Sequence, residues 1–182
     1  MRRLLLLLPL LLLLGCPKQK TSTTWEDPAL QVTGWAIFVA DAEGVTPPER
    51  MKVEARSRDG AFVLAEAPAL WIDEPPAGWR KWTRIGDATA RARLSNPQWI
   101  LDAASQGKEV VDAVLLVNPD PPPQPTSDGR ERIEDPRDIR QVLLDAGLEL
   151  GAVEGTSVPV RVPRGSWGAM LKLPHVLTAR AP

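Results

Sequence analysis

The chain has 182 residues, 22 of them basic and 23 acidic, which gives a formal net charge of −1 at pH 7. This balance excludes the strongly basic surface typical of nucleic-acid-binding proteins and of polybasic membrane contacts. One cysteine and one histidine exclude an internal disulfide and leave no ligand cluster for zinc or copper, so we expect no metal and no cofactor.

The first sixteen residues have the three parts of a secretory signal peptide. Arg2 and Arg3 precede a leucine-rich run from Leu4 to Leu14, and small residues follow it. The run is shorter than the roughly 20 apolar residues that a transmembrane helix needs. The single cysteine, Cys16, stands at the end of this segment, where a signal peptidase would cut.

In these residues the segment resembles a bacterial lipoprotein precursor, whose lipobox reads here Leu13-Leu14-Gly15-Cys16. The resemblance implies that the Cys16 thiol receives a diacylglyceryl group, that residues 1–15 are removed before Cys16, and that the new amine is acylated. Two or three acyl chains anchor a protein stably to a lipid bilayer, whereas one does not. An ordinary signal peptide with a chance cysteine near its cleavage site is the alternative.

The elements of the first half follow from periodicity and turn signals. Residues 16–29 are expected to form the lipidated cysteine and a flexible tether, and residues 30–40 a central strand that is apolar on both faces. Strands at 51–58 and 61–66 flank Asp59-Gly60, a strong hairpin signal. A two-residue turn there would gather the side chains of Val53, Ala55, Phe62 and Leu64 on one face of the hairpin.

The second half mixes strands with two helices. Pro75-Pro76 and Gly78 make residues 68–93 look irregular, and residues 88–94 are expected to form a strand. Helices are expected from Pro97 to Gly107 and from Pro136 to Gly147, because proline favours a helix start and glycine a helix end. Further strands are expected at 110–117, 148–153, 158–162 and 166–173, the third of them at a sheet edge because of Pro159 and Pro163. A proline-rich loop is expected at 118–129.

Strands therefore outnumber helices. We expect an α+β fold, a mainly antiparallel β-sheet with about two helices packed on one face, in a single domain from residue 30 to residue 182. No internal repeat is visible in the sequence.

The residue types that catalysis usually needs are not grouped in this sequence. His175 is expected to be an ordinary residue at the end of a strand, and Ser105-Gln106-Gly107-Lys108 to be a chance match to the S-x-x-K element of penicillin-binding proteins, which also needs two further motifs. Adjacent acids, such as Asp73-Glu74, are expected to be solvated. We therefore expect no catalytic residue and no enzyme activity.

One segment concentrates aromatic and charged side chains. Residues 71–82 contain three tryptophans together with basic and acidic residues. The candidate surface for a protein partner or a glycan consists of Trp71, Trp79, Arg80, Lys81 and Trp82. The alternative is that these rings pack over a sheet edge as a small satellite core.

Taken together, these features predict an exported, membrane-anchored envelope lipoprotein with a non-catalytic binding or scaffolding domain. We expect it on the periplasmic face of the outer membrane, with the cell surface and the inner membrane as alternatives, engaging another envelope protein. The alternative functions are a cell-wall or carbohydrate hydrolase that uses a carboxylate pair such as Asp73 with a distant glutamate, a module that binds peptidoglycan or another glycan, and a carrier of a hydrophobic ligand.

Overall fold

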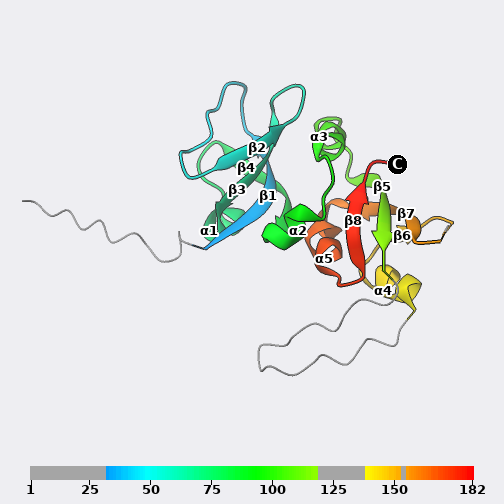
Figure 1. Ribbon diagram of the computed structural model, residues 1–182. Coiled ribbons are helices and arrows are strands. Elements are labelled where there is room, and N and C mark those ends of the chain that lie inside the picture. Colours follow the sequence, from blue (N-terminus) through cyan, green and yellow to red (C-terminus); the bar gives the residue numbers. More distant parts are fainter. Residues whose placement is uncertain (1–31, 119–137, 153–154) are drawn as a thin grey trace, which may run out of the picture.

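The computed structural model describes residues 32–118, 138–152 and 155–182 (Figure 1). In these ranges the elements are β1 (Thr33–Ala40), β2 (Lys52–Arg56), β3 (Phe62–Pro68), α1 (Ala69–Asp73), β4 (Trp79–Gly86), α2 (Ala88–Ala92), α3 (Gln98–Ser105), β5 (Val110–Val117), α4 (Ile139–Asp145), β6 (Glu149–Leu150), β7 (Ser157–Pro163), the 3-10 turn η2 (Arg164–Ser166), α5 (Trp167–Lys172) and β8 (Val176–Arg180). The predicted tether at 16–29 lies outside the described residues, as does nearly all of the predicted proline-rich loop. Within the described ranges, no helix is both long and apolar enough to cross a bilayer.

The strands form two antiparallel four-stranded sheets. Sheet A has the order β2-β3-β1-β4 and sheet B the order β6-β7-β5-β8. Figure 1 shows the two sheets side by side, with α2, α3 and α5 near the junction between them. The α+β class and the mainly antiparallel pairing are thus confirmed, but there are two sheets and five helices among the described residues, where one sheet and about two helices were expected.

The two sheets repeat one topology. When the strands of each sheet are counted in chain order, the third strand lies between the second and the first. The fourth strand pairs with the other edge of the first. The registers also agree, because Thr33 pairs with Pro68 at the start of β1, as Val110 pairs with Pro163 at the start of β5. A helix, α1 or α5, connects the third strand to the fourth in both halves. The two halves therefore share a chain path that the sequence does not reveal.

The main hydrophobic core lies between the sheets. One face of sheet A contributes Ile37, Leu64 and Trp82, and one face of sheet B contributes Leu115 and Val160 to the same buried cluster. The tryptophan that begins α5, Trp167, is fully buried in this cluster and contacts the ring of Trp99, with 5.6 Å between ring centroids. Residues from both sheets thus share a single core.

A second, smaller cluster covers the opposite face of sheet A. It contains Phe38 of β1, Val63 of β3, Ile72 of α1 and Trp79 of β4. Gly34 allows α1 to lie close to β1, because a Cβ atom there would come within 2.6 Å of the Ile72 Cδ1 atom. Sheet A is therefore packed on both faces.

The outer face of sheet B is exposed. Along β5, residues 111, 113, 115 and 117 are buried, and the residues between them are half-buried or exposed. Cross-strand partners share a face, so the outward side chains follow from the register of β5 with β7 and β8. We call this surface the open face of sheet B, and it consists of Asp112, Val114, Leu116, Pro159, Arg161, Thr178 and Arg180.

Several predicted elements are correct. The strand at 110–117 and the helix after Pro97 are found as β5 and α3, and the hairpin around Asp59-Gly60 pairs Ala55 with Leu64 as expected. The turn is wider than two residues, because the Ser57 N–H donates to the Phe62 carbonyl across it. A register shift between Val53 and Ala55 also directs Val53 to the second cluster, away from Ala55, Phe62 and Leu64.

Other predictions are wrong. Residues 88–92 form helix α2, capped by the Asp87 side chain, which accepts from the Ala90 N–H. The strand expected at 166–173 is mostly helix α5, and β4 and β8 lie in segments where no strand was expected. β7 is not an edge strand, since the two-residue β6 pairs with it at Val160 and Arg161.

Candidate functional site

The tryptophan segment does not form the predicted surface. Trp79 and Trp82 are only 4% and 6% exposed and belong to different buried clusters on opposite faces of β4. The strand geometry explains this, because Trp79 and Trp82 are three residues apart on β4 and side chains alternate between the two faces of a strand. The prediction is therefore wrong for both rings. Trp79 packs in the smaller cluster, as the satellite-core alternative expects, but Trp82 belongs to the main core.

The remaining members of the predicted surface lie on α1 and β4. Trp71 is half-buried on α1. Arg80 is exposed and forms an ion pair with Asp41. The Lys81 Nζ atom lies 3.7 Å from the Asp73 Oδ1 atom on α1. The positions of these side chains were not predicted because the strand that separates them, β4, was not recognised in the sequence.

The carboxylates proposed for hydrolysis have surface roles where the structure describes them. Asp73 faces two cations, since the Arg84 Nη1 atom is 4.0 Å from the same oxygen that Lys81 approaches. Its side chain is 68% exposed. Asp73 therefore forms exposed ion pairs at the surface of the domain.

Asp59 stabilises the hairpin turn between β2 and β3. Hydrogen bonds from the Ser57 hydroxyl and the Ala61 N–H hold the pKa of the Asp59 carboxyl below its usual value. The turn borders an open groove of about 760 Å³ lined by residues 40–47, Arg56 and residues 59–61. The bonding of Asp59 within its own turn indicates a structural role.

His175 and the S-x-x-K segment also have local structural roles. His175 is 4% exposed just before β8, and its Nδ1 atom lies 3.2 Å from the Asn118 carbonyl oxygen. Ser105 ends α3 and donates to the Asp102 carbonyl, while Lys108 lies beyond the helix. Among the residues that the structure describes, no three His, Cys, Asp or Glu side chains are grouped to hold a metal ion.

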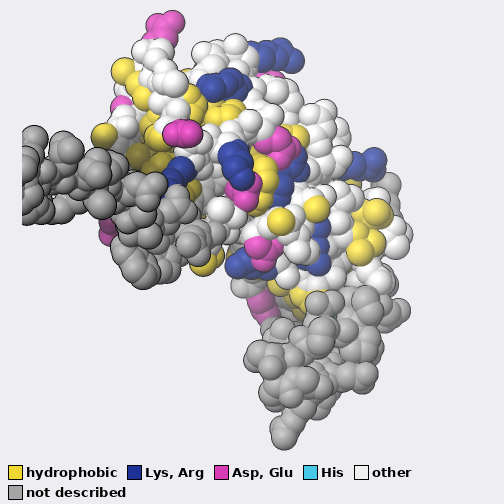
Figure 2. Space-filling view, turned by 60° about the vertical axis from the view of Figure 1, so that its left-hand side comes forward, with side chains coloured by type: hydrophobic (Ala, Val, Ile, Leu, Met, Phe, Trp, Pro, Cys, Tyr) yellow, Lys and Arg dark blue, Asp and Glu magenta, His cyan; other side chains and the backbone are white. Residues whose placement is uncertain are grey.

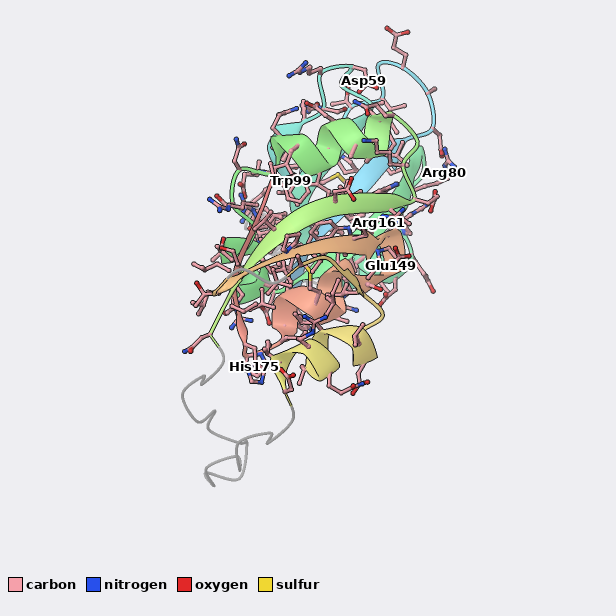
Figure 3. The ribbon with its side chains drawn as sticks, turned by 90° about the vertical axis from the view of Figure 1, so that its right-hand side faces the viewer. Asp59, Arg80, Trp99, Glu149, Arg161 and His175 are labelled. Carbon is pink, nitrogen blue, oxygen red and sulfur yellow. The ribbon has the colours of Figure 1, made fainter. Side chains whose placement is uncertain are left out.

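The open face of sheet B combines apolar and charged side chains. The Arg161 guanidinium lies between two acids, 2.6 Å from a carboxylate oxygen of Glu149 and 3.7 Å from one of Asp112. Figure 3 shows Arg161 and Glu149 close together on the strands of sheet B. Leu116 on this face is 37% exposed.

A shallow hollow marks one end of this face. It has a volume of about 310 Å³ and is lined by the Arg161 ion-pair network together with Val114, Leu150 and Pro159. Alternation of charged and apolar residues is weak in β5, where Asp112 is the single charged residue. That charge was the one signal in the sequence that one side of β5 faces solvent.

Comparisons with known proteins do not assign this chain to a family. No protein-family model, no curated protein and no solved structure matches it.

Proposed function

We propose that the protein is a bacterial envelope lipoprotein, anchored by acylated Cys16, whose domain binds or scaffolds another envelope protein without catalysing a reaction. The lipobox Leu13-Leu14-Gly15-Cys16 carries the anchoring part of this proposal. We place the protein on the periplasmic face of the outer membrane.

The open face of sheet B supports the binding part. On it, the apolar side chains of Val114, Leu116 and Pro159 adjoin the charged Arg161 and Arg180. Protein interfaces combine an apolar centre with charged side chains that set orientation. The buried state of Trp79 and Trp82 weakens the glycan alternative, because those rings were the candidates for stacking on sugars.

Cross-linking and affinity capture in the native envelope tests this proposal. We expect the wild-type chain to capture one envelope protein in stoichiometric amount. The double variant Leu116→Asp with Arg161→Glu should lower the recovery of that protein about tenfold or more, because loss of interface hot spots has an effect of this size. Leu144→Asp is the matched control, because Leu144 is 48% exposed on α4, away from the open face.

Recovery that is equal for the open-face variant and the wild-type chain would contradict the proposed surface. Retention of peptidoglycan fragments with no enriched protein would contradict the proposed class of partner. Capture from Cys16→Ala, which lacks the acylation site, shows which retained proteins depend on anchoring.

A further inference from the structure

Helix α1 packs on sheet A through Ile72 and leaves other apolar side chains partly exposed. Its first four residues, Ala69 to Ile72, are all apolar, and a helix that is apolar all round is normally buried. Here only Ile72 is fully buried, whereas Leu70 is 42% exposed and Trp71 is half-buried. Val32, at the start of the adjoining β1, is 64% exposed. We call Val32, Leu70 and Trp71 the α1 patch.

The α1 patch is held in a fixed shape by the backbone. The Ala69 N–H donates to the Val32 carbonyl at 2.7 Å, and the Glu74 N–H donates to the Leu70 carbonyl at 2.8 Å. Ile72 packs against Gly34 on the buried side. The exposed side chains are therefore presented on a preformed surface. Binding there does not cost the conformational entropy of ordering that surface.

The position of the α1 patch in the chain points to its occupant. Only residues 17–31 separate Cys16 from Val32, a stretch that spans at most about 50 Å when extended. Val32 is the described residue nearest to Cys16 along the chain, and the hydrogen bond from the Ala69 N–H to its carbonyl places α1 beside it. In Figure 1, α1 lies at the end of the molecule opposite β6 and β7 of sheet B.

The charges around the α1 patch are balanced. Lys81 and Arg84 lie within 4.0 Å of Asp73, and Glu74 follows directly on the chain. Figure 2 shows hydrophobic, basic and acidic side chains interspersed on one face of the molecule. A contact made here would depend on apolar insertion, with tryptophan at the interface between headgroups and acyl chains, and would depend little on anionic lipid.

We propose that the α1 patch rests on the lipid bilayer beside the acylated Cys16, and so directs the open face of sheet B away from the membrane. This inference rests on the proposed anchoring. Three apolar side chains bind a bilayer weakly by themselves, but the anchor holds the domain near the lipid surface at high effective concentration. A weak contact is then sufficient to orient the domain.

Quenching of Trp71 by brominated lipid tests the proposal. Cys16 is the only cysteine, so the chain beginning at Cys16 can be coupled to phosphatidylcholine vesicles that contain a maleimide lipid. The chain has seven tryptophans, and the difference between wild type and Trp71→Phe isolates the signal of Trp71. We expect that signal to be quenched by lipids brominated near the headgroup, equally at low and at high salt.

Two leucine variants provide the comparison. Leu70→Asp removes an exposed side chain of the α1 patch. It should reduce the bilayer-bound fraction, measured as quenching of Trp71, about tenfold. Leu144→Asp should leave this fraction unchanged. Three results would overturn the proposal. The first is equal quenching of the wild type and Trp71→Phe, and the second is an equal loss of quenching in both leucine variants. The third is loss of quenching at high salt. Because the maleimide lipid supplies the anchor, the result does not depend on whether the cell acylates Cys16.

Discussion

Replacing Trp167 by alanine is expected to lower the free energy of unfolding by about 3 to 5 kcal/mol, the usual cost of removing a large aromatic side chain from a core. Trp167 is fully buried and belongs to the cluster shared by both sheets. Its removal would also eliminate the contact with Trp99. Urea denaturation of the chain beginning at residue 16, with Cys16→Ser to prevent thiol reactions, measures the change.

Trp71→Ala provides the matched control. Trp71 is half-buried at the surface of the smaller cluster, so its loss should cost only about 1 kcal/mol. If both tryptophan variants lost the same stability, the core shared between the two sheets would not exist as described.

Replacing Arg164 by alanine is expected to cost about 2 to 3 kcal/mol, because its side chain links the two sheets. The guanidinium donates to the carbonyls of Lys81 and Trp82 on β4 and lies 3.2 Å from the Glu109 carboxylate. It also lies over the Trp82 ring, 5.7 Å from the centroid. Arg164→Lys should restore little of this, because an ammonium group cannot reproduce the forked geometry of a guanidinium.

Arg161→Ala is the control for this experiment. Arg161 also forms ion pairs, with Asp112 and Glu149, but on the open face of sheet B, where its side chain is 58% exposed. Surface ion pairs of this kind contribute about 0 to 1 kcal/mol. Thermal unfolding of both variants compares them, and an equal loss of stability would show that Arg164 does not connect the sheets.

Local signals predicted the elements whose apolar pattern was continuous. The eight residues of β5 are almost all β-branched or leucine, and α3 lies between Pro97 and Gly107. β4 follows Pro75-Pro76 and Gly78. Because these residues are typical of turns, the segment was expected to be irregular. Residues 88–92 alternate small and polar residues, but the Asp87 cap favours a helix there.

The two-sheet topology depends on contacts that no local pattern encodes. β1 pairs with β4, and β5 pairs with β8, across long stretches of chain. The two halves share strand order and register, but not side chains: Trp35 and Asp112 occupy equivalent positions in β1 and β5, one packed against the core and one exposed. Because side chains carry sequence similarity, the repeat was invisible before the fold was known.

The candidate surfaces also differ in whether a local pattern or a long-range contact defines them. The lipobox predicted from Leu13 to Cys16 is a contiguous motif, so a local pattern is enough to propose it. The binding surface inferred from residues 71–82 was wrong for Trp79 and Trp82, because both lie on β4, whose alternation directs them to opposite buried faces. The open face of sheet B is assembled from three strands and could be recognised only once their register was known.

The central claim is that Cys16 is the acylated first residue of the mature protein. Mass spectrometry of the N-terminal peptide from protein isolated from native membranes tests it most directly. We expect a peptide that begins at Cys16 and carries a diacylglyceryl thioether and an acylated amine. A mature chain that begins at another residue, or that begins at Cys16 with a free thiol, would contradict the account.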